Sequence, residues 1–411
     1  MGSLGEKIKK RRKQLKLTLK ELAGNDFSYS LLSQIENNKA KPSIATLEKL
    51  AEKLAMPVNE LINPAEIAHY RTLLSKFEKL TIMPYDRNPA IDKHILETIE
   101  PLLSTFQYTC YEEARLAELY SKSYFYYYGE IRKPILEKSM TYYEQIGLTH
   151  RKYKTQLFIC AAFINQGNYK ETQELLEEIV REVEKEEYVV EPMIAIDSYY
   201  YKSLIEAAAG AYLLAATFCM KALEIIKRTN LYYKTDAILR FQLLLYIQLQ
   251  HEEQGRANLK KLYHYVQFTE NIYDYTYYMY SKAHFENRLQ LNTQIIKELL
   301  HFIKSYLNRE EGELSTLYKQ ELAYAYWKEG RYEEALSQVK DYEIPAYVTH
   351  PLERSAGFEI IAVRAECLYK VGNEEEAIED IVYSWQQVKN MPDSTYKETI
   401  YRIYDAILKK G

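Results

Sequence analysis

The feature that most constrains this chain is a helical pattern that returns at a nearly constant spacing. Three segments align without gaps, and a fourth, around Ala215, fits with its Gly210 and Tyr212 at the same offsets. Each combines a helix end, a glycine two residues before an aromatic residue or its substitute, and then a small residue where two helices would cross. These small residues are Thr172, Ala215, Ala335 and Ala377. The first two are 43 residues apart and the last two are 42 apart, and the interval between the two pairs leaves room for units near Ala257 and Ile296. Such a period predicts stacked helix pairs rather than one globular core.

The composition favours long helices with short connections. The 411 residues include only 13 Gly and 11 Pro, so few residues interrupt helices. Hydrophobic residues make up 47% of the chain, which is ample for folding. We therefore expect an all-α protein, with an N-terminal five-helix domain followed by a right-handed α-solenoid of about six to eight helix pairs. An earlier pair around Gly129 and Ile135 extends the series.

The net charge of −4 conceals an asymmetry between the two ends of the chain. Residues 1–62 contain 12 Lys and Arg against 7 Asp and Glu, a net charge of +5, whereas the remainder carries −9. A basic head on an acidic body is the pattern expected when only the head meets nucleic acid phosphates. The alternative is a solvated basic helix without a partner.

The basic head contains start and stop signals for several short helices. Residues 4–15 are amphipathic and form the first. The second begins at the N-cap Thr18, with Glu21 as its capping-box partner, and ends at Gly24. A third helix is capped by Ser28 or Ser30, has an apolar side formed by Leu31, Leu32 and Ile35, and ends at Asn38, a residue that tolerates the left-handed conformation. Two short helices joined by so few residues form a helix-turn-helix.

Two more helices complete the predicted head. Ser43 caps a fourth helix, whose Leu47, Leu50 and Leu54 point inward, and the stretch PVNELI at residues 57–62 forms a fifth.

The stretches LTLKELA, SLLSQIE and PSIATLEKLA resemble the phage-repressor type of helix-turn-helix domain, the XRE or Cro/C1 family, over residues 4–62. This resemblance implies that the helix after Ser28 enters the major groove of double-stranded operator DNA. The residues then expected to face bases are Tyr29, Ser30 and Gln34. The residues expected to contact phosphates are Ser28, Asn37, Lys39, Lys41, Arg11 and Arg12, together with Lys13. The side-chain amide of Gln34 suits a bidentate contact to adenine, whereas Ser28 can also be a plain N-cap.

The repeated units of the body resemble tetratricopeptide repeats with long arms. Combined with the short turn in LAGNDFSYSLLSQIE, this resembles the peptide-regulated bacterial transcription factors of the RRNPP group. The resemblance implies a cytoplasmic quorum-sensing regulator that acts as a homodimer or tetramer and binds a short signalling oligopeptide in the concave groove of the repeats. It also implies an alternative, a scaffold like the related Rap proteins that binds a response regulator of the sporulation phosphorelay.

The predicted groove is rich in aromatic and amide side chains. Amides can pair with the backbone of an extended peptide, and tyrosines give rigid walls with a polar tip. With 41 Tyr in the chain, any single tyrosine can equally be core or surface. The residues that the repeat register places in the groove are Tyr120, Tyr124, Tyr127, Asn165, Tyr200, Gln242, Tyr246, Gln250, Ser281, Gln320 and Tyr324.

These patterns divide the chain into three predicted segments. Residues 1–62 form the helix-turn-helix domain, residues 63–92 a helical linker, and residues 93–411 the peptide-binding and oligomerisation domain. Apolar spacing through Leu73, Leu74, Phe77 and Leu80 makes the linker a stiff helix, followed by a loop-like run.

Several classes of protein are not expected. The sequence has no metalloprotease, serine-hydrolase, Walker or dinucleotide-binding motif, so we expect no enzymatic activity, no cofactor and no metal. Its four cysteines lack paired spacing and are expected to be reduced. No run of about 18 apolar residues is present, so we expect neither a membrane span nor a signal peptide.

Overall fold

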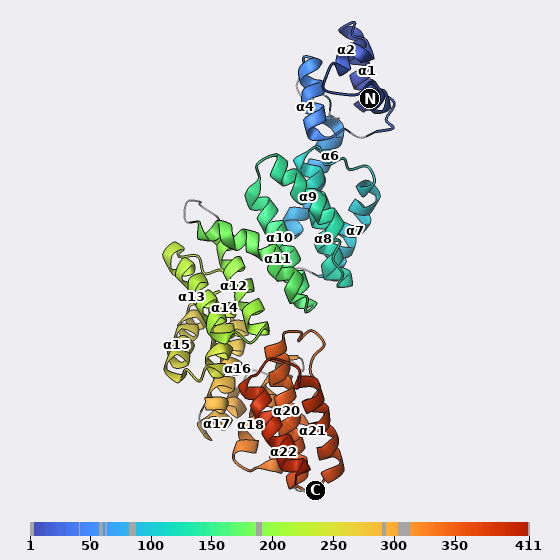
Figure 1. Cartoon of the computed structure of the whole chain (residues 1–411). Coiled ribbons are helices and arrows are strands. Elements are labelled where there is room, and N and C mark those ends of the chain that lie inside the picture. Colours follow the sequence, from blue (N-terminus) through green and yellow to red (C-terminus); the bar gives the residue numbers. More distant parts are fainter. Residues whose placement is uncertain are drawn as a thin grey trace. The chain divides into compact units, whose positions relative to one another are not determined.

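The computed structural model describes residues 4–40, 42–56, 61, 64–81, 88–185, 191–289, 293–302 and 313–409. Within these ranges every regular element is an α-helix, which confirms the predicted all-α class. The chain forms two compact units, Met1–Ile159 and Cys160–Gly411, and the boundary between them falls inside α10 (Thr149–Asn165) (Figure 1).

The head begins with four short helices whose ends agree with the predicted signals. They are α1 (Leu4–Gln14), α2 (Leu19–Ala23), α3 (Tyr29–Glu36) and α4 (Ile44–Lys53). The Thr18 hydroxyl accepts from the Glu21 N–H and the Glu21 carboxylate accepts from the Thr18 N–H, which confirms the capping box. Ser28 and Ser43 cap α3 and α4, and Asn38 has a φ of 55°. The predicted fifth helix lies, apart from the helical Leu61, outside the described residues.

The head has its own hydrophobic core beneath α3. Leu32 and Ile35 of α3 are buried together with Leu22, Leu47 and Leu50. The N-terminal end of α1 lies unusually close to the end of α3, because a Cβ at Gly5 would come within 2.5 Å of the carbonyl oxygens of Ile35 and Glu36. Only glycine fits there.

A buried ion pair joins the same two helices. The Arg12 guanidinium donates to both carboxylate oxygens of Glu36, at 2.6 and 2.8 Å, and to the carbonyl of Leu17 at 2.8 Å. Only 11% of the Arg12 side chain and 3% of the Glu36 side chain are exposed. The pair therefore fixes α1 against α3.

The rest of the first unit consists of α6 (Pro64–Thr81), α7 (Pro89–Leu103), α8 (Tyr111–Tyr128), α9 (Lys133–Gln145) and the start of α10. The predicted connector is indeed helical. It buries Leu74 and Phe77 in a cluster shared with α7 and α8, and Glu78 pairs with Arg115 of α8 at 2.8 Å. The connector thus belongs to a packed bundle in addition to joining two predicted segments.

The second unit is a series of helix pairs. After α10 the helices are α11 (Tyr169–Glu184), α12 (Pro192–Ala208), α13 (Tyr212–Thr229), α14 (Thr235–Gln248), α15 (Glu252–Thr269), α16 (Ile272–Leu289), α17 (Thr293–Phe302), α18 (Glu313–Lys328), α19 (Tyr332–Val339), α20 (Pro351–Lys370), α21 (Glu374–Val388) and α22 (Thr395–Leu408). Consecutive helices pair from α12 onward, and α22 packs on both α20 and α21 (Figure 1).

The turns and crossings of these pairs follow the predicted repeat. The turn glycines Gly167, Gly210, Gly330 and Gly372 all have positive φ, and the small residue five positions after each is fully buried. The middle unit corrects the prediction of Ala257. There Gln250 takes the left-handed turn position with a φ of 55°, and Gly255 is the small residue, because a Cβ on it would lie 2.2 Å from the ring of Phe285.

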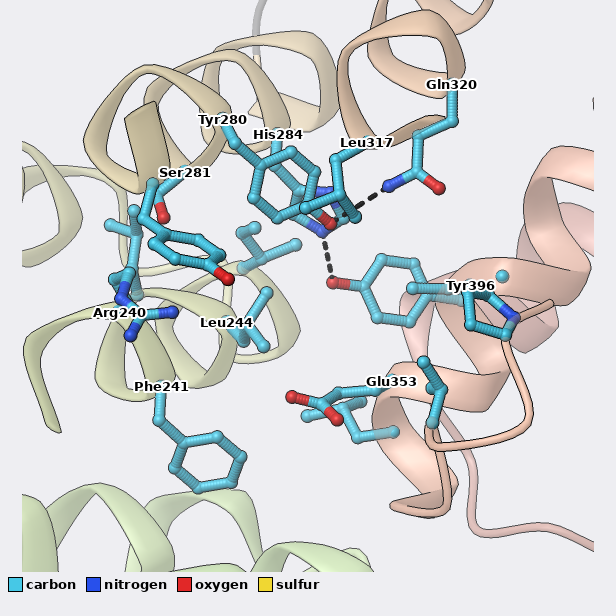
Figure 2. A pocket seen from close by; sticks show the side chains of 18 of the residues that line it. Arg240, Phe241, Leu244, Tyr280, Ser281, His284, Leu317, Gln320, Glu353 and Tyr396 are labelled. Carbon is cyan, nitrogen blue, oxygen red and sulfur yellow. Dashed lines mark hydrogen bonds between the residues drawn. The ribbon is translucent and has the colours of Figure 1, made fainter. Parts of the chain in front are cut away.

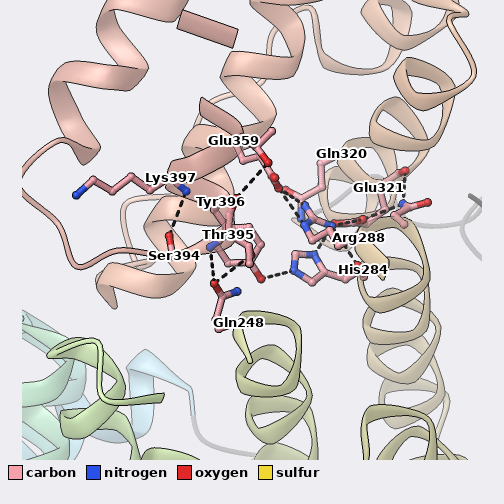
Figure 3. A network of polar contacts seen from close by, with 12 residues as sticks. Gln248, His284, Arg288, Gln320, Glu321, Glu359, Ser394, Thr395, Tyr396 and Lys397 are labelled. Carbon is pink, nitrogen blue, oxygen red and sulfur yellow. Dashed lines mark hydrogen bonds and ion pairs between the residues drawn. The ribbon is translucent and has the colours of Figure 1, made fainter. Parts of the chain in front are cut away.

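A buried polar network joins α16, α18, α20 and α22 (Figure 3). The Arg288 guanidinium pairs with Glu321 and Glu359, each at 2.9 Å. His284 lies 2.7 Å from Glu321 through Nδ1 and 2.8 Å from the Tyr396 hydroxyl through Nε2. Buried ion pairs therefore join α16, α18 and α20, and a buried hydrogen bond joins α16 to α22.

The protonation states follow from these contacts. Burial opposes the ionisation of Glu321, but the charge of Arg288 and the hydrogen bonds from His284 and Asn287 bring its pKa down to about 2. Burial, together with the cation of Arg288, lowers the pKa of His284. Because the Glu321 carboxylate can only accept, Nδ1 of His284 donates to it, and Nε2 of the neutral ring accepts from Tyr396.

A second buried histidine, His350, caps the start of α20. Its Nδ1 accepts from the Leu352 N–H at 3.2 Å, and its Nε2 donates to the Leu204 carbonyl of α12 at 3.0 Å. Burial lowers the pKa of His350. Protonation of Nδ1 would remove the cap.

We expect the stability of the second unit to fall as the solution is acidified from about pH 7.5 to 5.5. A histidine with a lowered folded pKa binds its proton more readily in the unfolded chain, so stability is lost as pH falls below about 6.5. The limiting slope is about 1.4 kcal/mol per pH unit for each such histidine. Chemical unfolding of the full chain at each pH measures this slope, which His350→Gln should reduce. The exposed His264→Gln is the control, and an equal slope in wild type and His350→Gln would contradict the assignment.

We expect Arg12→Ala to destabilise the head by about 3 kcal/mol, because Glu36 is then left buried without its counter-charge. Hydrogen exchange of the amides in α3 measures the loss, and Lys13→Ala, which removes an exposed charge from the same helix, is the control. An Arg12→Met/Glu36→Leu double variant should recover much of the stability. An Arg12→Ala variant as stable as the wild type would show that the ion pair between Arg12 and Glu36 does not hold the head together.

Candidate functional site

The first candidate site is the outer face of α3. Tyr29, Ser30 and Gln34 are all exposed, and Tyr29 is 60% exposed. On the opposite side of the same helix, Leu32 and Ile35 fill the core. Gln34 makes no side-chain hydrogen bond to any residue that the structure describes, so its amide is free to form two contacts elsewhere. The three residues predicted to face bases are thus presented together.

The residues predicted to contact phosphates divide into two groups. Ser28, Asn37 and Lys39 are exposed at the two ends of α3. The Ser28 hydroxyl caps the helix by accepting from the Leu31 N–H at 3.1 Å, and the Asn37 amide donates to the Ser33 carbonyl at 2.8 Å. Lys41 lies outside the described residues.

Two arginines correct the phosphate prediction. Arg12 is buried against Glu36, as described above, and its guanidinium faces the interior. Arg11 donates to the carbonyls of Leu54 and Ala55, each at 3.0 Å, and so closes the end of α4. Both side chains are used to build the head, because the last carbonyls of a helix and a buried carboxylate need donors.

The second candidate site is a pocket inside the unit Cys160–Gly411. It is a cavity of about 300 Å³, at the lower end of the range for small-molecule sites. Helices α12, α14, α16, α18, α20 and α22 contribute to its wall, together with the loop between α19 and α20 (Figure 2).

The wall is made by stripes of residues three and four positions apart on the helices. The stripe on α14 includes Ala237, Arg240, Phe241 and Leu244, and the stripe on α16 includes Tyr277, Tyr280, Ser281 and His284. On α18 the pair Leu317 and Gln320 continues the pattern. This spacing places the side chains on one face of each helix. The pocket therefore arises where the first helices of successive pairs turn the same face inward.

Polar tips reach the pocket between its apolar side chains. The Gln320 amide donates to the Tyr280 hydroxyl at 3.0 Å, and the His284 and Tyr396 side chains meet at the pocket wall (Figure 2). Two charged residues, Arg240 and Glu353, also line the cavity. The pocket thus offers aromatic surfaces, hydroxyl groups, an amide and one charge of each sign.

The predicted groove is only partly reproduced. Tyr200, Ser281 and Gln320 line the pocket. Tyr120 is a core residue of the first unit, 3% exposed, with its hydroxyl on Glu100. Tyr124 stacks under the Arg132 guanidinium at 3.9 Å, and Tyr127 is exposed on the same helix.

The remaining predicted residues of the second unit lie elsewhere. Gln242 and Tyr246 are buried on the other side of α14, and Gln250 is in the turn after that helix. Tyr324 is 4% exposed and packs on Arg288. Asn165 is exposed at the end of α10.

The sequence analysis missed Arg240, Tyr280 and Glu353. On α14 the predicted residues and the pocket-lining residues differ in register, because the stripe that faces the pocket begins one or two residues away from the predicted one. A charged residue inside an otherwise apolar stripe, as at Arg240, was the available signal. No sequence pattern placed Glu353, since its position depends on the long loop that precedes α20.

Two further searches cover the residues that the structure describes. No helix there is long and apolar enough to cross a bilayer. The same residues contain no group of three or more His, Cys, Asp or Glu side chains arranged to hold a metal ion.

Comparison with known proteins identifies the head. Residues 5–67 match the sequence family described as a helix-turn-helix domain, in agreement with the geometry of α2 and α3. No curated protein sequence matches the chain.

Among solved structures, the chain is similar to the crystal structure of Bacillus thuringiensis PlcR in complex with the peptide PapR7 and DNA. The two share 18% sequence identity with a TM-score of 0.38, over 66% of this chain and 96% of the other. The match of residues 5–67 to the family, together with α2 and α3, makes the N-terminal part of the chain a helix-turn-helix domain; paired helices follow it.

Proposed function

We propose that this chain is a transcriptional regulator of the RRNPP group, most like NprR, whose binding to operator DNA is controlled by a short signalling peptide. The observation that carries the proposal is the outer face of α3. A helix-turn-helix presents Tyr29, Ser30 and Gln34 to solvent while the opposite side of the helix forms the core. Exposed polar side chains at these positions are the groups that contact base edges when such a helix lies in the major groove.

Charge supports the same role for the head. The first 62 residues carry the positive charge of a chain that is acidic elsewhere, and exposed Lys39 follows α3 directly. Phosphate contacts of this kind set the register of a protein on DNA, and base contacts then read the sequence. A homodimer would present two such heads to half-sites about one helical turn, or a multiple, apart.

The lining of the pocket supports the proposal that the chain binds a peptide. Aromatic walls with polar tips and a few convergent polar groups are the usual lining of a ligand site. A cavity of about 300 Å³ is at the small end for a ligand site, so the pocket would anchor part of an oligopeptide.

Regulation follows if the peptide binds one arrangement of the helices better than another. His284 and Tyr396 line the pocket and also belong to the network that joins α16 to α22. A ligand that competes for the Tyr396 hydroxyl would change how α22 is held. The size of the response is limited by the difference in affinity between the two arrangements.

We expect Gln34→Ala and Lys39→Ala to affect DNA binding differently. Loss of the Gln34 amide should relax discrimination between bases at one position by about 1–3 kcal/mol. Loss of the Lys39 charge should weaken binding to all DNA sequences nearly equally, and should lower the slope of log affinity against log salt concentration by about one. Selection from a random duplex pool with the full chain, followed by titrations at several salt concentrations, measures both. The exposed Arg228→Ala is the control.

Identical specificity profiles for the two variants would contradict the assignment of α3. If the chain showed no sequence-selective binding at any ionic strength, the proposal would fail and the alternative scaffold, which binds a response regulator, would be favoured.

We expect Ala356→Trp to abolish peptide binding by filling the pocket from α20. The probe is a pool of random heptapeptides with free ends, captured by the full chain and identified by mass spectrometry. Wild type and the exposed control Ala406→Trp should enrich the same peptides, and Ala356→Trp should enrich none, with all three chains melting at similar temperatures. Equal enrichment by Ala356→Trp would place the peptide outside this pocket.

A further inference from the structure

We propose that the pocket selects a peptide segment carrying two opposite charges, with a carboxylate at Arg240 and a cation at Glu353. This inference rests on the proposed function, in which the pocket holds a peptide. It goes further by naming the chemistry of the ligand and the two residues that select it.

Arg240 can accept an anionic group although it already has a partner. Its Nη2 pairs with Asp236 one turn earlier at 2.9 Å, and its guanidinium lies 4.6 Å from the centre of the Tyr277 ring. Its Nη1 forms no hydrogen bond with any residue that the structure describes, and Arg240 lines the cavity. The Tyr277 ring and Asp236 hold the guanidinium in place. A ligand carboxylate at Nη1 would form a charge-assisted hydrogen bond with this positioned group.

Glu353 is the complementary group. It lies in the first turn of α20 and lines the cavity, but it forms no hydrogen bond or ion pair with any residue that the structure describes. It does not pair with Arg240, so the two charges stay separately available across the pocket. Figure 2 shows their side chains reaching the cavity from different helices. A primary amine or guanidinium of a ligand is the natural partner for this carboxylate.

The remaining wall is uncharged, and this makes the two positions selective. His284 is neutral and already occupied by Glu321 and Tyr396. Between the charged ends the ligand meets side chains such as Phe241, Leu244 and Tyr280. An apolar residue fits there, while a charged residue would lose its water without a partner. The selected segment is therefore an apolar residue flanked by one acidic and one basic group.

Each charge has two possible sources in a peptide. The carboxylate can be the C-terminus or an Asp or Glu side chain, and the cation can be the N-terminus or a Lys or Arg side chain. A second heptapeptide pool with acetylated and amidated ends separates them. Enrichment that survives capping assigns the charges to side chains, and enrichment lost on capping assigns them to the termini.

The experiment compares the heptapeptides captured by wild type, Glu353→Lys and Arg240→Glu, with Glu379→Lys and Arg228→Glu as controls at exposed positions. Wild type and both controls should enrich segments with both charges. Glu353→Lys should lose the preference for a cation, and Arg240→Glu the preference for an anion. The best wild-type peptide should bind each pocket variant at least about tenfold more weakly, as loss of one charged hydrogen bond implies.

The possible outcomes distinguish a failure of this inference from a failure of the proposed function on which it rests. If wild type enriches peptides that share no charge pattern, or if Glu353→Lys enriches the same peptides as wild type, the inference is overturned while the peptide receptor stands. If wild type enriches nothing from either pool, the proposed function itself fails and the inference fails with it. Thermal melts of all five chains show that each variant is folded.

Discussion

The architecture depends on a steric constraint at the crossing of helices. The second helix of a pair must pass close to its neighbours, and it can do so only where it presents a residue without bulk. At Gly255 the ring of Phe285 occupies the space of a Cβ, and Thr172, Ala215, Ala335 and Ala377 are fully buried at the equivalent positions. Close crossing brings the first helices of successive pairs alongside one another. Their inward stripes then converge, and the pocket is the result.

A buried ionic network lies between the first helices α16, α18 and α20 and the last helix α22. Arg288 pairs with both Glu321 and Glu359, and His284 hydrogen-bonds to Tyr396 of α22. Gln248 of α14 also accepts from the backbone N–H of Thr395 at 2.9 Å. Buried ion pairs add little net stability but are costly to break. Their effect is to fix which helices are neighbours, and two of their members also line the pocket.

The head uses its charges in a different way. Arg11 and Arg12 sit in a basic run, yet one closes α4 and the other neutralises Glu36. The positive charge that remains at the surface near α3 is therefore smaller than the residue count suggests. The outer face of α3 is not needed to satisfy the ends of the helix, because Ser28 accepts from the Leu31 N–H at one end and Asn37 donates to the Ser33 carbonyl at the other. The side chains that build the head and those exposed on the outer face of α3 are therefore different ones.

The sequence by itself determined the helices, their caps and the period of the repeat, because these depend on interactions within a few residues along the chain. Thr18, Ser28, Ser43 and Asn38 act where the local patterns predicted. The exposed face of α3 also followed from the sequence, since the apolar side of a short helix fixes the other side.

Only the tertiary structure decided which face of each long helix points into the pocket. A shift of one or two residues, about a quarter to a half of a helical turn, moved Gln242 and Tyr246 of α14 out of the cavity and brought in Arg240 and Phe241. It likewise decided that Arg12 is buried, because its partner lies 24 residues away on another helix. Glu353 reaches the pocket only through the path of the loop before α20. Such positions depend on packing between distant segments, and periodicity within one helix does not contain that information.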